Sequence, residues 1–290
     1  MEIRQLRYFV AIADTGSFSE ASRRCYLSQS AISQQIKLLE EEFNTLLFNR
    51  TSHSVSLTEC GERFLPLARK ILSDISQCQD QMGDTGQRLQ GILNIGSTYS
   101  LEPYIRRAVA LFIKLHPNVQ VNLRFETIAG LIKTLRNGEL DLACSMVVEG
   151  ETDWVISDPI TQYRLCAVMS DTHPLSQRES VSINDLRQYG MILPEEGVNG
   201  SNAIQEYLCK EAVDLKVRAT VNNPSTILSI LKQSRCISIL SEWQTKGDPS
   251  LKAIPIEEIS EPVTTYAHLL KGTYTKRSAQ AFIKTLHEQL

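Results

Sequence analysis

The apolar residues near the N-terminus repeat with two helical periods that a short break separates. The first period places three side chains on one helix face: Phe18, Ala21 and Cys25. The second period gives a buried stripe at similar spacing: Ala31/Ile32, Ile36, Leu39 and Phe43. Ser17 or Ser19 can cap the first predicted helix. Ser28 or Ser30 can cap the second, and Leu27 fills the break between the two helices.

The outer face of the second helix is polar. Its side chains are Gln29, Ser30, Ser33, Gln34 and Lys37. Short polar side chains near a helix N-terminus are what a base-reading helix presents to a major groove. Arg23 and Arg24 belong to the first helix and can contact phosphates instead. An ordinary helical hairpin with a solvated face has the same spacing, so the pattern by itself leaves both interpretations open.

A short apolar hairpin is predicted after Asn44, where the second helix ends. Its apolar residues are Leu46, Leu47, Phe48, Val55 and Leu57. They flank a polar tip, residues 49–54, that carries Arg50 and His53. A small β-wing of this kind can hold phosphate or minor groove while the helix reads bases. The wing therefore favours a DNA-binding unit that includes the helix-turn-helix over residues 18–37.

Two further helices complete this region. An opening helix packs on the reading unit through Ile3, Leu6, Phe9, Val10 and Ala13. A long helix, capped by Thr58, runs to about residue 88. Its apolar positions alternate steps of four and three, as in a heptad seam: Phe64, Ala68, Ile71, Ile75, Cys78 and Met82. Two copies can bury this seam as a dimer contact; the alternative is a helix that lies on its own domain. The polar run 79–90 marks the best domain boundary.

Beyond Gly91 the pattern changes to alternating strands and helices. Strands are predicted over residues 92–96, 119–125, 140–146, 165–170, 191–193, 217–221, 237–240 and 264–270. Helices are predicted from 101, around 131–135, from 182, and over 201–211, 225–232 and 278–290. This alternation predicts two α/β units joined by crossing strands, an arrangement that suits a hinged, two-lobed binding domain.

Hydroxyl and amide side chains gather where strands of this region end and helices begin. They are Ser97, Thr98, Tyr99 and Ser100 in one lobe with Thr127 and Ile128, and Asn199, Ser201, Asn202, Asn222 and Thr226 in the other. Ligands of such sheets bind outside the carboxyl ends of the strands, where helix N-termini favour anions. We predict a site for a small carboxylate or phosphate. Ser, Thr and Asn also cap ordinary helices, so each loop has this second interpretation.

Composition narrows the class of protein. The 290 residues are enough for two or three domains, and the formal net charge of −3 gives no global sign of nucleic-acid binding. The seven cysteines form no CxxC pair, so we expect reduced thiols that act as small hydrophobes. The sequence contains no recognisable nucleophile motif, phosphate-binding glycine loop or zinc spacing. We therefore expect neither an enzyme nor a metal or cofactor site.

The ends and apolar runs of the chain bear on its location. Glu2, Arg4 and Arg7 interrupt any apolar run that a signal peptide needs. No stretch approaches the roughly 20 apolar residues of a membrane-spanning helix. These observations predict a cytoplasmic protein.

The N-terminal motifs together resemble the LysR-type transcriptional regulators. The matching residues are Leu6-Arg7-Tyr8-Phe9, Gly16-Ser17-Phe18 with Ala21, Ser28-Gln29 with Ala31 and Ser33, Ile36, Leu39-Glu40, Leu47-Phe48 with Arg50, and Leu57-Thr58 with Gly61. The sequence departs from the family's usual pattern at Cys25, Gln34 and Asn44, where Leu, a basic residue and Gly are frequent. The change at Gln34 concerns the DNA sequence that is read.

The region after Gly91 resembles the family's effector domain more loosely. The matches are His116-Pro117, Gly138-Glu139-Leu140-Asp141, His173-Pro174-Leu175 and 237–240, with Ser234 and Cys236 where the family commonly has glycines. The resemblance implies a fold similar to periplasmic binding proteins. Peroxide-sensing relatives carry two reactive cysteines. In this chain only Cys209 is comparable to one of them, and Asn199 occupies roughly the place of the other. A two-cysteine redox switch is therefore not expected.

The expected protein has three parts. Residues 1–58 form a winged helix-turn-helix, 59–90 a linker and dimerisation helix, and 91–290 a two-lobed α/β effector-binding domain. Lobe I covers about 91–161 and 266–290, and lobe II about 162–265. The partners implied are double-stranded DNA, a small anionic effector, further copies of the chain as dimer or tetramer, and RNA polymerase as a further candidate. The alternatives are a small-molecule binding protein whose N-terminal module binds protein and, third, a hydrolase.

Overall fold

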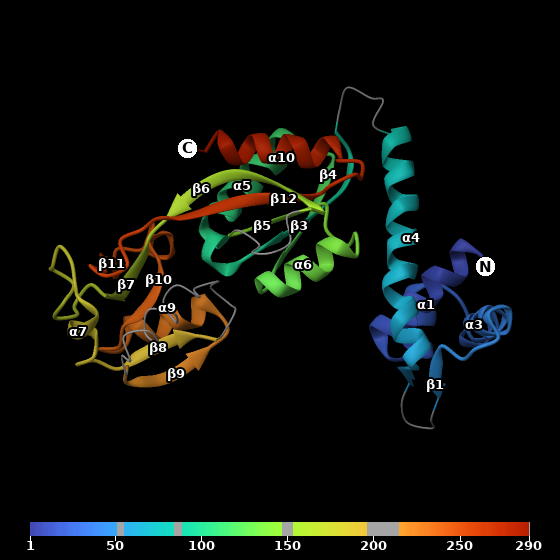
Figure 1. Cartoon of the computed structure of the whole chain (residues 1–290), viewed down its shortest axis with the longest axis horizontal. Helices are drawn as coiled ribbons and strands as arrows, with labels where there is room; N and C mark the ends of the chain where they lie inside the picture. Colours follow the sequence, from blue (N-terminus) through green and yellow to red (C-terminus); the bar gives the residue numbers. More distant parts are fainter. Residues whose placement is uncertain (51–54, 84–88, 147–152, 196–214, 290) are drawn as a thin grey trace. The chain divides into compact units, whose positions relative to one another are not determined.

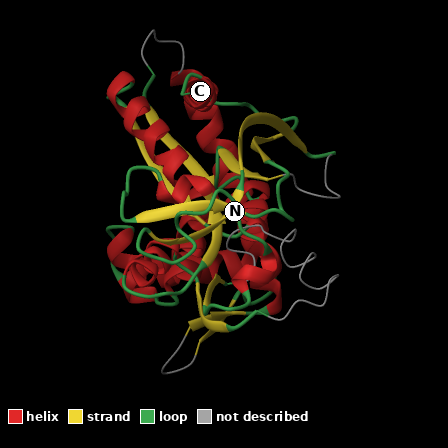
Figure 2. Ribbon diagram, turned by 90° about the vertical axis from the view of Figure 1, so that its left-hand side faces the viewer, coloured by secondary structure: helices red, strands yellow, loops and turns green. Residues whose placement is uncertain are grey.

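The computed structural model describes residues 1–50, 55–83, 89–146, 153–195 and 215–289 (Figure 1). They form two compact units: an N-terminal unit, Met1–Thr85 with Arg136–Glu139, and a C-terminal unit, Gly86–Leu135 with Leu140–Leu290. In the described residues, strands and helices alternate in the C-terminal unit, whereas the N-terminal unit has helices and one hairpin. Figure 2 shows the helices and strands of the chain in separate colours. Within the described ranges, no helix is both long enough and apolar enough to cross a bilayer.

A helix-turn-helix with a β-wing forms most of the N-terminal unit, as predicted. Its elements are α1 (Ile3–Thr15), α2 (Phe18–Arg24), α3 (Gln29–Phe43), β1 (Phe48–Arg50), β2 (Val55–Leu57) and α4 (Glu59–Gly83). The Ser17 hydroxyl accepts a hydrogen bond from the Glu20 N–H at 3.3 Å. The Ser28 hydroxyl accepts one from the Ala31 N–H at 3.2 Å. In each pair of candidate caps, the first serine is therefore the one that caps the helix.

One apolar core holds these helices together. Its fully or nearly buried members are Leu6, Phe9, Ile12, Phe18, Ala21, Ile32, Ile36, Leu39, Leu47, Phe48 and Ala68. The Phe9 ring lies 5.2 Å from the Phe48 ring and 5.1 Å from the Phe64 ring, measured between centroids. These contacts join α1 to the wing and to α4, so the reading unit and the start of the long helix form one packed body.

Four residues predicted to be buried are more exposed than expected. They are Ile3, Leu27, Phe43 and Leu46, with 48%, 38%, 37% and 65% of their surface exposed. Each lies at the end of a helix or in a connection, where only one side of the residue meets the core. Phe43 still packs edge-on against Phe64, with ring centroids 5.0 Å apart.

The long helix α4 corrects the predicted dimer seam. Thr58 caps it as expected, because its hydroxyl accepts a hydrogen bond from the Gly61 N–H at 3.0 Å. Ala68 is fully buried in the core of its own unit, so its assignment to an intersubunit seam is wrong. Phe64 and Ile71 also pack against this core but keep part of their surface exposed. Part of the heptad spacing therefore reflects packing within one chain.

A five-stranded sheet is the first layer of the C-terminal unit, in the order β4-β3-β5-β12-β6. Its strands are β3 (Gly91–Ser97), β4 (Val119–Phe125), β5 (Leu142–Met146), β6 (Val155–Tyr163) and β12 (Val263–Leu270). β3 pairs in parallel with β4 and β5, whereas β12 pairs antiparallel with β5 and β6. Helices α5 (Glu102–Leu115) and α10 (Arg277–His287) cover one face and α6 (Ile128–Arg136) covers the other (Figure 1).

The second lobe has its own strands. They are β7 (Leu165–Ser170), β8 (Met191–Pro194), β9 (Val217–Val221), β10 (Ser238–Ser241) and β11 (Leu251–Pro255), with the orders β10-β7-β11 and β8-β9. A bridge between Met191 and Ile237 links the two sets. Among its described residues, this lobe has the helices α7 (Ile183–Leu186) and α9 (Pro224–Lys232). The described part of the unit also has two short helical turns, η1 (Tyr99–Leu101) and η2 (Glu242–Thr245). The predicted two-lobed α/β fold is thus confirmed.

The sequence pattern did not predict two of the strands, β6 and β11, and both lie next to the crossings between lobes. β6 leads into β7 with one residue between them, and β11 precedes β12. Pro159 lies inside β6 and argues against a strand there. The structure accommodates it by a register shift: Thr265 lies opposite Thr161, whereas the next residue, Tyr266, lies opposite Pro159. The predicted helix over 201–211 lies outside the described residues.

Candidate functional site

The outer face of α3 is the first candidate site. Gln29, Ser30, Gln34 and Lys37 are exposed, and Ser33 is half-buried. On the opposite face, Ile32, Ile36 and Leu39 are fully buried, so packing fixes which side of the helix faces outward. This arrangement presents amide, hydroxyl and ammonium groups on a rigid support, as base and phosphate recognition requires.

Arg23 and Arg24 lie on α2, just before the turn. Both are largely exposed, and both pair with Glu20, at 3.0 Å and 4.0 Å between charged atoms. Exposed ion pairs of this kind contribute little to stability. The two guanidinium groups can therefore exchange Glu20 for a phosphate at small cost.

Arg50 occupies a different place from the one predicted. It was expected at the tip of the wing, but it is the last residue of β1 and its side chain turns toward α3. Its guanidinium pairs with the Glu40 carboxylate at 2.8 Å and donates to the Ser33 hydroxyl at 3.3 Å. It also lies over the Phe18 ring, 4.8 Å from the centroid. His53, the other wing candidate, lies outside the described residues.

Glu40 is the functional residue that the sequence analysis missed. Only 5% of it is exposed. One carboxylate oxygen accepts from the backbone N–H groups of Leu47 and Phe48 at 2.9 and 3.2 Å, and the other holds Arg50. A carboxylate next to Leu39 on the buried side of a helix was the available signal, because a buried charge needs a partner. Glu40 and Arg50 fix the wing against the reading helix.

The exposed apolar side of α4 is the second candidate site. Leu67 and Met82 have 58% and 74% of their surface exposed, and Cys60 and Cys78 are exposed as well. Ile71 and Ile75 are half-buried beside them. The sequence analysis did not select Leu67, but this residue takes the place of Ala68 on the exposed side of α4. With Leu67, the apolar positions from Phe64 to Ile71 are three and four residues apart. Such a line suits a helix-to-helix contact.

The candidate effector loops of the first lobe lie together at the carboxyl edge of the sheet. The Glu126 N–H donates to the Ser97 carbonyl at 3.1 Å, which joins the ends of β3 and β4. Thr98 donates its N–H to the Cys144 carbonyl of β5 at 3.0 Å. Ser97, Thr98 and Ser100 are buried, whereas Thr127 and Ile128 are half-buried at the start of α6. The Thr127 hydroxyl accepts from the Gly130 N–H at 3.2 Å, so it serves as a helix cap.

The second lobe contributes fewer described candidates. Asn222 and Thr226 are exposed at the start of α9, and the cap there is Asn223, whose side chain accepts from the Thr226 N–H at 3.2 Å. Asn199, Ser201 and Asn202 lie outside the described residues. Which groups face the first lobe from that segment therefore stays a prediction.

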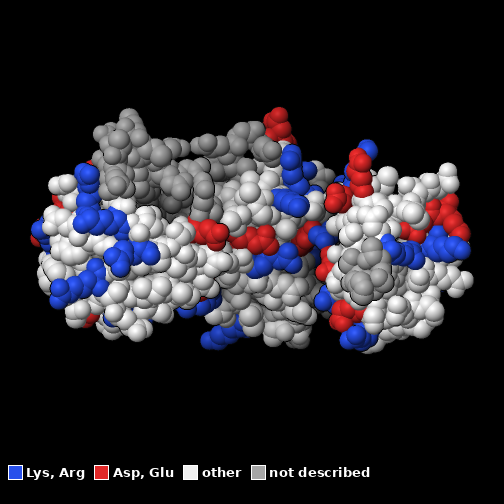
Figure 3. Space-filling model, turned by 90° about the horizontal axis from the view of Figure 1, so that it is seen from below, with Lys and Arg blue, Asp and Glu red and all other residues white. Residues whose placement is uncertain are grey.

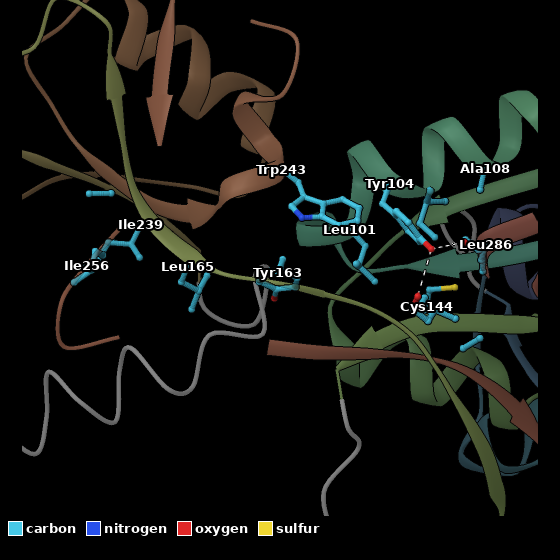
Figure 4. Packing of buried hydrophobic residues seen from close by; sticks show 14 of the residues in the cluster. Leu101, Tyr104, Ala108, Cys144, Tyr163, Leu165, Ile239, Trp243, Ile256 and Leu286 are labelled. Carbon is cyan, nitrogen blue, oxygen red and sulfur yellow. Dashed lines mark hydrogen bonds between the residues drawn. The ribbon is translucent and has the colours of Figure 1, made fainter. Parts of the chain in front are cut away.

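The two lobes meet through aromatic and amide side chains, of which Figure 4 shows the aromatic pair Tyr104 and Trp243. The Tyr104 ring of α5 packs edge-on against the Trp243 ring of η2, with centroids 4.7 Å apart. The Tyr104 hydroxyl donates to the Leu286 carbonyl of α10. Gln244, also in η2, donates to the Tyr99 carbonyl at 2.8 Å. A ligand that changes the angle between lobes must disturb the Tyr104–Trp243 and Gln244–Tyr99 contacts, and no sequence motif indicated either one.

Two buried cysteines are poor candidates for redox chemistry. Burial raises the pKa of Cys144 to about 12. Burial, with a smaller contribution from the Glu242 carboxylate, raises the pKa of Cys166 to about 12. Thiols of such high pKa are unreactive at neutral pH. Cys209 lies outside the described residues.

Charge is distributed in small groups. On the face shown in Figure 3, basic side chains form several separate clusters with acidic ones between them. This distribution agrees with the net charge of −3, and it indicates DNA binding through local contacts rather than through a broad basic surface. In the part of the chain that the structure describes, no group of three or more His, Cys, Asp or Glu residues is placed to hold a metal ion.

Comparison with known proteins identifies both units. Residues 3–62 match the family model described as bacterial regulatory helix-turn-helix protein, lysR family, and residues 86–290 match the LysR substrate binding domain. The hydrogen peroxide-inducible genes activator of Haemophilus influenzae is 30% identical over 255 residues, covering 88% of this chain and 84% of that protein. The transcriptional regulator CfxR of Cupriavidus necator is 28% identical over 242 residues, covering 83% and 76%.

Solved structures agree on the fold. A full-length OxyR variant of Pseudomonas aeruginosa has a TM-score of 0.75 at 21% identity, covering 99% of this chain and 94% of that one. CbnR in complex with its target DNA has a TM-score of 0.73 at 20% identity, covering 100% of both chains. The two family models together span nearly the whole sequence, and the chain belongs to the LysR family of DNA-binding transcriptional regulators.

Proposed function

We propose that this regulator binds a two-fold DNA site as a dimer or tetramer, with α3 reading base edges in the major groove. The observation that carries the proposal is the division of α3 into a fully buried apolar face and an exposed polar one. Gln29 and Ser33 are the proposed base contacts. Arg23, Arg24 and Lys37 are proposed to hold phosphates, and the wing with Arg50 and His53 to hold the backbone beside them.

The exposed apolar side of α4 supports the proposed oligomer. A line of Leu67, Ile71, Ile75, Cys78 and Met82 at steps of three and four gives a second copy a matching surface. Two reading helices related by a two-fold axis then contact two half-sites of one operator.

The C-terminal unit is proposed to bind a small organic anion between its lobes. Ser97–Ser100 supply hydroxyls and amides at the start of η1 and α5, and the segment around Asn199–Asn202 supplies similar groups from the other lobe. Helix N-termini and hydroxyls favour carboxylate or phosphate. A ligand held by both lobes favours one lobe arrangement, and in an oligomer this changes the spacing or bend imposed on DNA. RNA polymerase is a further proposed partner.

The test compares two substitutions on the same helix face. A pool of random duplexes, selected on the full-length protein, first defines the preferred site. Gln29→Ala should then weaken binding to that site by about 1–3 kcal/mol and relax the preference at one base pair. Lys37→Ala should weaken binding to selected and random duplexes alike and lower the salt dependence by about one unit.

The control for these substitutions is Lys114→Ala, at an exposed lysine of α5 outside the reading unit. It should leave both DNA affinities unchanged. Equal losses on selected and random DNA for Gln29→Ala would contradict base reading by this helix face.

A further inference from the structure

The turn between α2 and α3 contains a residue that the function described so far does not use. Tyr26 follows the end of α2 with a backbone φ of +55°. Its N–H donates to the Arg23 carbonyl at 3.2 Å, and the Leu27 N–H donates to the Ser22 carbonyl at 3.0 Å. These two bonds form a Schellman motif with Tyr26 at the left-handed position, where glycine or asparagine is usual.

A tyrosine is an unfavourable choice for this position. Its Cβ approaches the backbone in the left-handed conformation, a strain that glycine avoids. The side chain also gives the fold little in return, because 94% of the residue is exposed. Backbone strain that no packing contact offsets indicates a functional role.

The surroundings of Tyr26 favour a nucleic-acid partner. It lies two residues before Ser28, where the polar face of α3 begins, and two residues after Arg24, which is exposed like Arg23. Cationic and short polar groups on both sides suit a phosphate backbone better than an apolar protein surface. A tyrosine hydroxyl donates to phosphate oxygen, and its ring can pack on a sugar.

We propose that Tyr26 is an additional DNA contact, whose hydroxyl donates a hydrogen bond to a backbone phosphate next to the bases that α3 reads. The inference rests on the proposed reading role of α3. Because the contact is to the backbone, it adds affinity for all sequences. Because the phenol is neutral, it adds no counterion release and leaves the salt dependence unchanged.

Two substitutions of the full-length protein separate the hydroxyl from the backbone strain. Tyr26→Phe removes only the hydroxyl, and Tyr26→Asn removes the ring while suiting the left-handed conformation. The probe is a fluorescent 30-base-pair duplex of random sequence, measured at several salt concentrations. Tyr26→Phe should weaken binding about three- to tenfold with an unchanged salt slope. Tyr26→Asn should weaken it at least as much while the Tm of the protein stays equal or rises.

The matched control is Tyr8→Phe, at a half-buried tyrosine of α1 in the same unit, which should bind as the parent does. Parental affinity of both Tyr26 variants for the random duplex, with Gln29→Ala still weakened on the selected site, would overturn the Tyr26 contact and leave the reading helix intact. Parental affinity of Gln29→Ala for the selected site as well would instead overturn the proposed function. A lower Tm for Tyr26→Asn would make the ring structural, and dissociation of the oligomer in sedimentation would make it a protein contact; either result overturns the proposal.

Discussion

The proposed DNA-reading surface and the proposed effector site of this protein are built in different ways. The candidate DNA contacts come from one helix, α3. Burial of Ile32 and Ile36 on one side of this helix leaves Gln29 and Lys37 facing outward on the other. In the C-terminal unit the candidates come from the ends of β3 and β4, which strand pairing brings together, and from loops of a separate lobe. Side chains on one helix are positioned by the helix itself, whereas side chains in loops after different strands are positioned only by the assembled sheet.

The comparison also shows where each site is vulnerable. The proposed reading surface depends on one ion pair, between the buried Glu40 and the exposed Arg50, that holds the wing to the helix. The proposed effector site depends on contacts between the two lobes, among them Tyr104 with Trp243 and Gln244 with Tyr99. A single substitution should therefore unfold the first region more readily than the second.

The largest effect is expected at Glu40. Glu40→Ala leaves two backbone N–H groups and Arg50 without their acceptor, and should destabilise the N-terminal unit by about 3 kcal/mol. Both tryptophans of the chain, Trp154 and Trp243, lie in the C-terminal unit. Tryptophan fluorescence in urea should therefore be unchanged while hydrogen exchange of α3 amides accelerates. Glu41→Ala, at the exposed neighbour, is the control and should change stability by under about 0.5 kcal/mol. Equal effects of the two substitutions would remove Glu40 from its proposed role.

Leu67→Asp tests whether the oligomer belongs to the N-terminal unit. A charge placed in a buried helix contact is costly, so self-association should weaken at least tenfold, or about 1.4 kcal/mol. Sedimentation at micromolar concentration measures this. The control is Leu46→Asp, an equally exposed leucine before the wing, which should remain associated. A Leu67→Asp protein that sediments as the parent does would place the contact elsewhere.

His268 provides a pH test of the C-terminal unit. Burial lowers the pKa of this imidazole, against the opposing effect of its bond to the Met146 carbonyl at 3.1 Å. The unfolded chain therefore binds the proton more readily. The stabilisation is present above the ordinary pKa of about 6.5 and is lost as pH falls below it, by at most about 1.4 kcal/mol per pH unit.

Urea melts followed by tryptophan fluorescence from neutral to mildly acidic pH measure this loss. In His268→Gln the pH dependence should be flatter than in the parent. A parental slope for His268→Gln would show that other groups titrate.

The smallest effect is expected in the effector cleft. Thr98→Val keeps the volume and removes a hydroxyl, and should cost about 1 kcal/mol in affinity for an anion recovered by a thermal-shift screen. Ser201→Ala should act in the same direction from the other lobe, and DNA affinity without ligand should not change. Thr134→Val is the control, because its hydroxyl bonds a carbonyl of its own helix, α6. Calorimetric titration that finds parental affinity for both Thr98→Val and Ser201→Ala would place the pocket elsewhere.

The sequence by itself determined what depends on neighbours along the chain. Apolar spacing and serine caps gave α2 and α3, and alternating patterns gave most strands of the C-terminal unit, because helix periods and caps are local. The polar face of α3 could be predicted for the same reason. The loops after β3 and β4 could be proposed because carboxyl ends of parallel strands share an edge.

Only the tertiary structure decided the contacts between distant segments. The spacing of α4 fits both Ala68 and Leu67, and packing on α1 buried the first and exposed the second. Arg50 looked like a free cation until Glu40 was seen to hold it. Pro159 argued against β6 until the register shift opposite Tyr266 gave it a place. In each case the local pattern allows several outcomes, and the free energy of long-range burial and pairing selects one.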